Sequence, residues 1–178
     1  MNGAATLKKK DTYPSDVWRW DTGEAMATCY DIANHFLTLG ASDDGEMISN
    51  LKLQKLAYYA QGFALAIMDR PLFAEGIEAW DHGPVVPDLY HTYKKYGASV
   101  ITAPEGYDPD QALSAQEQAL LNDVYLSYGQ YTAWKLRDLS HEESPWKDAY
   151  SKGSGTIITP DAMKIYFREN LIEPTQEA

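Results

Sequence analysis

The chain has 178 residues, of which 44% are apolar and 23% charged, so it is long enough for one domain with a sizeable core. It contains no run of about 18 apolar residues, so we expect no membrane span, and the lysines at 8–10 precede no apolar segment of a secretory signal. The net charge of −11 at pH 7 repels phosphate, so we expect no nucleic-acid binding by this chain alone; the acidity fits a basic partner and equally serves solubility.

Residues 1–24 are polar and contain Pro14 and Gly23, a composition typical of an N-terminal arm that is partly flexible. Trp18 and Trp20 are exceptions in this arm, because two tryptophans are costly to leave in water. We therefore expect them to dock, either on the protein's own body or on a partner or a second copy.

Helical spacing fills most of the chain that follows. A first helix is predicted over 25–39, and Asn50 is a good N-cap for a second helix that ends near Met68. The residues Ile77–Trp80 read as a short strand. Gly83 then turns the chain, and Pro84 suits the first turn of a third helix that reaches residue 94 or 96.

The second half of the chain predicts several shorter elements. Their starts carry capping signals: Ser114 and Glu117 form a capping box, and Thr132 and Thr159 are single caps. Trp134 is a candidate for the core. Helices are expected over 114–127, 133–139, a short stretch from Ser144, and 160–170, with extended residues at 156–158. These elements predict a mainly α fold: a compact single-domain bundle of about six or seven helices with two or three short β-strands.

The predicted helix from Asn50 carries the most specific pattern, SNLKLQKLAYYAQG over residues 49–62. Leucines and Phe63 recur every three or four residues and form an apolar face. Four polar side chains lie outside that face, where the core does not need them: Lys52, Lys55, Tyr58 and Gln61. The lysines either pair with local carboxylates, for modest stabilisation, or line a partner-binding groove.

Two further motifs, Trp80–Val85 and Ser144-Pro145-Trp146, are best explained as structural parts of the fold. Gly83 lets the backbone turn without a Cβ clash, and Pro84 fixes a helix start. The tryptophans of both motifs fill the core or pack against it, and His141 bonds across to the turn at Ser144. The residues that we assign to structure are Asn50, Trp80, Gly83, Pro84, His141, Ser144, Pro145 and Trp146.

We find no enzyme signature, and we expect no catalytic residues, no cofactor and no metal. A zinc-protease helix needs a second histidine four residues after His141, where this chain has Pro145. Asp81-His82 and His141-Glu142 supply metal-ligand residue types, but a histidine beside a turn more often satisfies a backbone carbonyl. The single cysteine, Cys29, excludes an internal disulfide and fits a reducing cytoplasm, where we expect the protein to act.

Three motifs stand in a fixed order in this chain: residues 49–62, then Pro71–Phe73 followed by Ile77–Tyr90, and last Leu139–Trp146. Their residues, order and approximate spacing resemble the Panacea domain of the SocA-like antitoxin family, also called phage-associated GepA-like proteins. The resemblance covers about residues 29–171. It implies an arm at 1–24, a Panacea domain at 25–172 and a C-terminal tail at 173–178.

The resemblance implies an antitoxin of a toxin–antitoxin system, encoded in bacteria or phages beside the toxic protein that it neutralises. Members of the family are understood to act by direct protein–protein binding, and their toxins are so diverse that the domain does not identify the toxin. One member is understood as an adaptor that delivers its toxin to the ClpXP protease, which is an alternative for this chain. A further alternative is an unrecognised enzyme built on His82, His141 and Glu142.

Two hypotheses place the toxin on this chain. The first uses the turn at His82–Pro84 and the polar face of the second helix, formed by Lys52, Lys55, Tyr58 and Gln61. The second uses Trp18 and Trp20, since buried aromatic residues and arginine are typical anchors of interfaces. The arm lies outside the resemblance, so specificity particular to this protein is expected there. The sequence leaves open whether the protein is a monomer or a homodimer.

Overall fold

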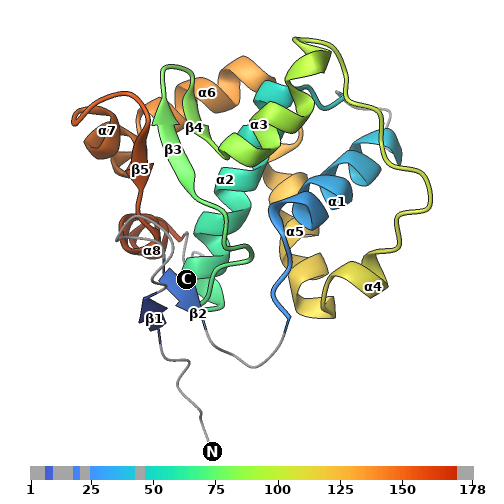
Figure 1. The fold of residues 1–178 in the computed structure, drawn as a ribbon, viewed down its shortest axis with the longest axis horizontal. Helices are drawn as coiled ribbons and strands as arrows, with labels where there is room; N and C mark the ends of the chain where they lie inside the picture. Colours follow the sequence, from blue (N-terminus) through green and yellow to red (C-terminus); the bar gives the residue numbers. More distant parts are fainter. Residues whose placement is uncertain (1–6, 10–17, 21–24, 43–46, 172–178) are drawn as a thin grey trace, which may run out of the picture.

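The computed structural model describes residues 25–42 and 47–171, together with the backbone of 7–9 and 18–20. These residues form eight α-helices, one 3₁₀ helix and five short strands, so the predicted mainly helical class is confirmed. Helix α2 (Asn50–Ile67) lies at the centre of the molecule (Figure 1). The other helices are α1 (Cys29–Ser42), α3 (Pro87–Tyr93), η1 (Lys94–Tyr96, the 3₁₀ helix), α4 (Pro109–Ala112), α5 (Ala115–Tyr128), α6 (Ala133–His141), α7 (Ser144–Tyr150) and α8 (Pro160–Glu169).

A small antiparallel sheet lies beside α2, in the order β4-β3-β5. Its strands are β3 (Ile77–Trp80), β4 (Gly83–Val85) and β5 (Thr156–Ile158), and the first and last confirm the two extended segments expected from the sequence. A tight turn joins β3 to β4 and places Trp80 opposite Gly83. Gly83 has a φ of +99°, and a Cβ there would lie 2.7 Å from Cε of Lys55, so only glycine fits this turn.

Helix α2 is buried on nearly all sides, since 15 of its 18 residues are buried. It contacts α1, α3, α5, α6, α8 and β4, and its leucines join one core with the apolar side chains of these elements. Gly62 brings α8 especially close, because a Cβ at this position would lie 2.2 Å from the ring of Phe167. A helix this enclosed has no exposed polar face, so its lysines and glutamines lie inside the molecule.

Most of the predicted helix starts are correct, because local capping controls them. The capping box of Ser114 with Glu117 is present, and Thr132 and Thr159 cap α6 and α8. The cap of α2 differs from the prediction: Ser49 accepts from the backbone N–H of Lys52, and Asn50 is already the first helical residue. The Asn50 side chain is directed inward instead, as described below.

Five other expectations are corrected by the structure. Pro84 lies in β4 and does not open a helix, because Pro87 begins α3. Trp134 is 58% exposed and lies outside the core, and Trp80 is only half-buried. Ser144 is exposed and belongs to the first turn of α7, so the N-cap position is taken by Glu143. Helix α1 begins at Cys29 and continues past Gly40 to Ser42.

Strands β1 (Leu7–Lys9) and β2 (Trp18–Trp20) pair antiparallel, with Lys8 opposite Arg19. The side chains of this ladder lie outside the described residues, so the docking of Trp18 and Trp20 stays a prediction. The tail at 173–178 also lies outside the described residues. Among the described helices, none has the length and apolar character needed to cross a lipid bilayer.

Candidate partner-binding surface

The two lysines of the predicted polar face are buried inside the molecule. Nζ of Lys52 donates a hydrogen bond to the carbonyl oxygen of Gly129 at 2.6 Å, and Nζ of Lys55 donates to that of Pro84 at 2.9 Å. Burial, reinforced by the positive charge of Arg137, lowers the pKa of Lys55 to about 7. Both lysines therefore tie α2 to the turns that surround its N-terminal half.

The adjacent tyrosines converge on one buried carboxyl group. The hydroxyl of Tyr58 donates to Oε2 of Glu143 at 2.8 Å, and the hydroxyl of Tyr59 donates to Oε1 at 2.7 Å. Burial raises the pKa of Glu143 to about 7, while the two donors favour the ionised form and limit the rise. Because Glu143 is the N-cap residue of α7, this cluster fixes α7 against α2.

Gln61, the last of the predicted polar residues of α2, forms hydrogen bonds with backbone groups of the segment that follows α2. Its Nε2 donates to the carbonyl oxygen of Phe73 at 2.8 Å, and its Oε1 accepts from the backbone N–H of Leu72 at 2.8 Å. The expectation that the core does not need these polar side chains is therefore wrong, because each one satisfies a buried group that would otherwise lose its partner. Contact between them and a toxin stays a prediction.

Replacing Gln61 with alanine is expected to lower the free energy of unfolding by about 2 kcal/mol, because buried backbone groups at Leu72 and Phe73 lose their partners. Gln111→Ala is the control, since that side chain is exposed and bonds to exposed Asp108. Urea unfolding followed by tryptophan fluorescence measures both variants. Equal stability of Gln61→Ala and the unchanged protein would show that water replaces the lost hydrogen bonds.

An open groove of about 550 Å³ lies above this buried network, bordered by the start of α2, the β3–β4 turn, α3 with η1, and the start of α6. Aromatic rings form its walls. Trp80 and Tyr90 meet edge to face with ring centroids 4.8 Å apart, and His82 meets Trp134 in the same way at 5.4 Å. The structure thus brings the predicted residue His82 together with Trp134, which the sequence had placed in the core.

The groove is held in shape by buried amides of α2. Asn50 donates from Nδ2 to the carbonyl oxygen of Tyr90 at 3.3 Å, and its Oδ1 accepts from Gln54 at 2.8 Å. Oε1 of Gln54 in turn accepts from the backbone N–H of Val86 at 2.9 Å. This chain of bonds fixes both the α3 wall and the β4 wall, so the groove is formed before any partner arrives.

The carboxylates beside the groove already accept hydrogen bonds. Asp81 accepts from the Tyr150 hydroxyl at 2.9 Å and from Ser154 at 3.1 Å, and these bonds lower the pKa of Asp81. Glu78 accepts from Nε1 of Trp80 at 2.8 Å. These bonds favour the ionised form of Asp81, so a negative charge stays at the β3–β4 turn beside the groove.

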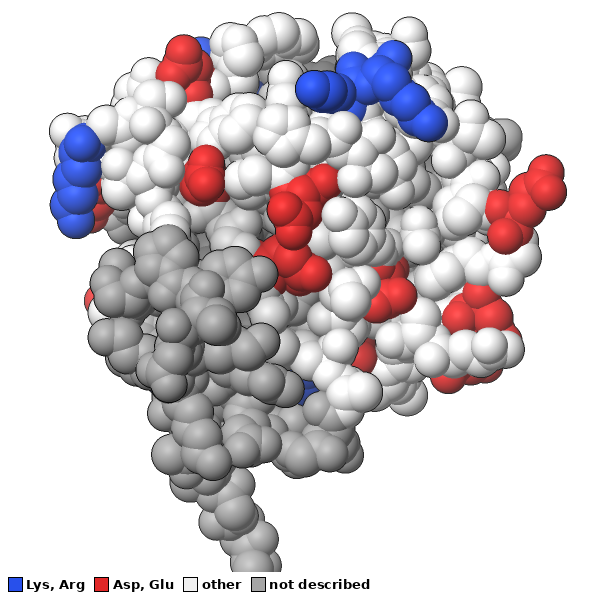
Figure 2. All heavy atoms as spheres, in the orientation of Figure 1, with Lys and Arg blue, Asp and Glu red and all other residues white. Residues whose placement is uncertain are grey.

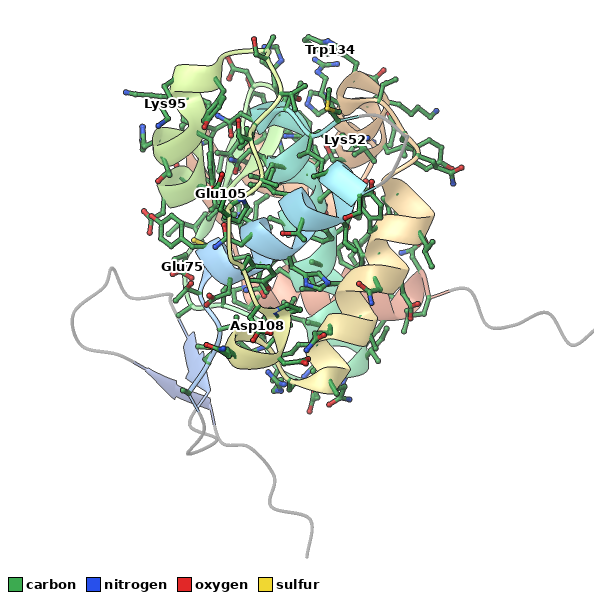
Figure 3. All side chains as sticks on the ribbon, turned by 90° about the vertical axis from the view of Figure 1, so that its right-hand side faces the viewer. Lys52, Glu75, Lys95, Glu105, Asp108 and Trp134 are labelled. Atoms are coloured by element: carbon green, nitrogen blue, oxygen red, sulfur yellow. The ribbon has the colours of Figure 1, made fainter. Side chains whose placement is uncertain are left out.

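Basic residues gather around the same groove. Lys94 and Lys95 form most of η1, Lys135 follows Trp134, and the guanidinium of Arg137 lies 5.8 Å from the centre of the Trp134 ring. Figure 2 shows basic side chains at the end of the molecule formed by α3 and η1, and acidic side chains scattered over the face below. In Figure 3, Lys95 and Trp134 stand at this end, on either side of the start of α2. Among these basic residues Lys94 lines the groove, as Asp81 does, and the others lie outside its lining.

The third sequence motif, Leu139–Trp146, supports the β3–β4 turn from the side of α7. The ring of His141 stacks on Trp146 with centroids 3.9 Å apart, and Nε1 of Trp146 donates to the carbonyl oxygen of Trp80 at 2.9 Å. Burial lowers the pKa of His141. In the part of the chain that the structure describes, no three His, Cys, Asp or Glu side chains are placed to hold a metal ion.

Comparison with known proteins agrees with these motifs. Residues 53–147, which cover most of α2, strands β3 and β4, most of the groove lining and Trp146, match the family described as Antitoxin SocA-like, Panacea domain. The chain is 31% identical over 145 residues to Antitoxin SocA of Caulobacter vibrioides (strain NA1000 / CB15N), a match that covers 71% of this chain and 72% of that protein. No solved structure matches the chain. The protein belongs to the SocA-like antitoxin family and carries its Panacea domain.

Proposed function

We propose that this protein is an antitoxin that neutralises a cognate toxic protein by binding it directly. The observation that carries the proposal is the match to Antitoxin SocA across more than two thirds of both chains. The structure supports partner binding more than catalysis. The polar residues of α2 are buried and form hydrogen bonds inside the fold, and the groove offers exposed aromatic rings, which are typical anchors of protein interfaces.

Growth of a bacterial strain tests the proposal. The gene encoded next to this one is expressed alone and together with this protein, and we expect arrest in the first case and growth in the second. A pull-down of the neighbouring gene product with tagged antitoxin then tests direct contact. Arrest that co-expression does not relieve, or a harmless neighbour, would contradict the assignment of that pair.

Delivery of the toxin to ClpXP predicts a different outcome in the same strain. An adaptor shortens the half-life of the toxin, and rescue then requires an intact ClpXP protease. Direct neutralisation predicts that the toxin accumulates in a stable complex and that rescue persists in a strain without ClpX. Measuring toxin levels by immunoblot after translation is stopped separates the two mechanisms.

A further inference from the structure

We propose that the groove lined by Trp80, His82, Tyr90 and Trp134 is the site that binds the toxin, and that it takes a toxin segment in which a large apolar side chain is flanked by Asp or Glu. The inference rests on the proposed function and deepens it, because it names the surface and the chemistry of the partner.

The apolar part of the partner follows from the walls of the groove. Trp134 is 58% exposed although it is the kind of residue that proteins bury, and its ring borders a cavity of about 550 Å³ together with three further rings. Since Asn50 and Gln54 hold the walls by hydrogen bonds, a partner loses little affinity to ordering them. A rigid, aromatic, partly open groove fits a single apolar anchor.

The acidic part of the partner follows from two exposed lysines, Lys94 in the lining of the groove and Lys135 next to Trp134. Lys94 and Lys135 are exposed and form no ion pair with any residue that the structure describes. The nearby carboxylates of Glu78 and Asp81 accept hydrogen bonds from their neighbours, and that of Asp138 pairs with Arg137 at 2.8 Å. The carboxylate of Asp81 stays ionised, so the inference rests on Lys94 and Lys135, which carboxylates on the partner segment would complement.

Binding of the purified product of the neighbouring gene by titration calorimetry tests the apolar anchor. Trp134→Ala is expected to raise the Kd at least about tenfold, because an exposed tryptophan at the centre of an interface contributes strongly. Ile165→Ala on α8 is the control: its side chain is 60% exposed, close to the 58% of Trp134, and α8 lines no part of the groove. It is expected to leave the Kd within about twofold of the unchanged protein.

Association rates test the charge. Lys94→Glu is expected to slow association several-fold at low salt and to lose this effect at high salt, since screening removes interactions between exposed charges. Lys147→Glu on α7 is the control, because it makes the same charge change on a half-exposed side chain outside the groove. Faster association of Lys94→Glu would show that the partner segment is basic and would overturn its assigned chemistry.

Failure of this inference differs from failure of the proposed function. If the unchanged protein binds the neighbouring product and Trp134→Ala binds equally well, the groove is not the site and the antitoxin function stands. If the unchanged protein fails to bind and fails to rescue growth, the proposed function itself is contradicted. Circular dichroism of each variant checks that the fold is kept, which we expect because the changed side chains are exposed.

Discussion

Gly62→Ala is expected to lower the free energy of unfolding by about 3 kcal/mol, because overpacking of a tight core contact forces the structure to move. The added Cβ would lie 2.2 Å from Cε2 of Phe167, and no real contact is that short. The Phe167 ring has little freedom to move aside, since it packs edge to face on Phe63 at 4.9 Å and on Tyr58 at 5.6 Å. The better helix propensity of alanine, about 1 kcal/mol, offsets only part of this cost.

Gly76→Ala provides the matched control, because a Cβ at that position would meet no atom within 4 Å. Its midpoint in urea is expected to equal that of the unchanged protein. Phe167→Leu made together with Gly62→Ala is expected to destabilise less than the two single changes added, because both act on one contact. Additive losses would show that the Phe167 contact is not the cause.

The helical fold was predictable because its signals are local. The capping box at Ser114, the caps at Thr132 and Thr159 and the apolar spacing of α2 each depend on residues within one or two turns. The start of α3 was misplaced for the same reason. Pro84 and Pro87 both suit a first helical turn, and only the pairing of β4 with β3, a contact between segments, selects Pro87.

The interior position of the α2 polar residues could not be predicted, because their partners are distant in sequence. Lys55 meets Pro84, Lys52 meets Gly129, and the tyrosines meet Glu143. A polar side chain on an apolar helix looks the same in sequence whether it faces water or a buried carbonyl. The family motif of α2 is thus explained by the fold, and its residues brace the groove from below.

A signal for the exposure of Trp134 was present in the sequence. In α6, Leu136 and Ser140 are buried and lie one turn apart, which defines the inner face. Trp134 precedes Leu136 by two residues, about 200° around an α-helix, so it faces away from the core. Its hydrophobicity alone indicated burial, and the helical phase indicated exposure. The phase was correct, and it points to a residue that forms part of the wall of the proposed binding groove.

Two separate buried groups, Glu143 and Lys55, are expected to give the free energy of unfolding a minimum near pH 7. The pKa of Glu143 is raised from 4.5 to about 7, so the native state holds this proton where the unfolded chain has released it. The contribution of Glu143 to the free energy of unfolding is complete below pH 4.5 and falls by about 1.4 kcal/mol per pH unit towards pH 7. The pKa of Lys55 is lowered from 10.5 to about 7, so its contribution rises with pH above 7 and is lost as pH falls through 7.

Two variants separate these contributions when urea unfolding is measured between about pH 5 and about pH 9. Glu143→Gln cannot ionise, so we expect its stability curve to lack the fall on the acid side while the rise on the alkaline side remains. Lys55→Met keeps an apolar stem of similar length without an amine, and it should lose the alkaline rise alone. The pH range ends at the ordinary pKa of 9.0 for cysteine. Burial raises the pKa of Cys29, so above pH 9.0 this residue makes the free energy of unfolding fall as pH rises. Each difference between a variant and the unchanged protein cancels the titrating groups that do not interact with the changed side chain. The pKa of His141 is lowered by burial and, among other causes, by the charge of Lys55, so Lys55→Met also alters the titration of His141. Parallel curves would mean that both side chains are hydrated in solution, and the buried network that shapes the groove would then be looser than the hydrogen bonds describe.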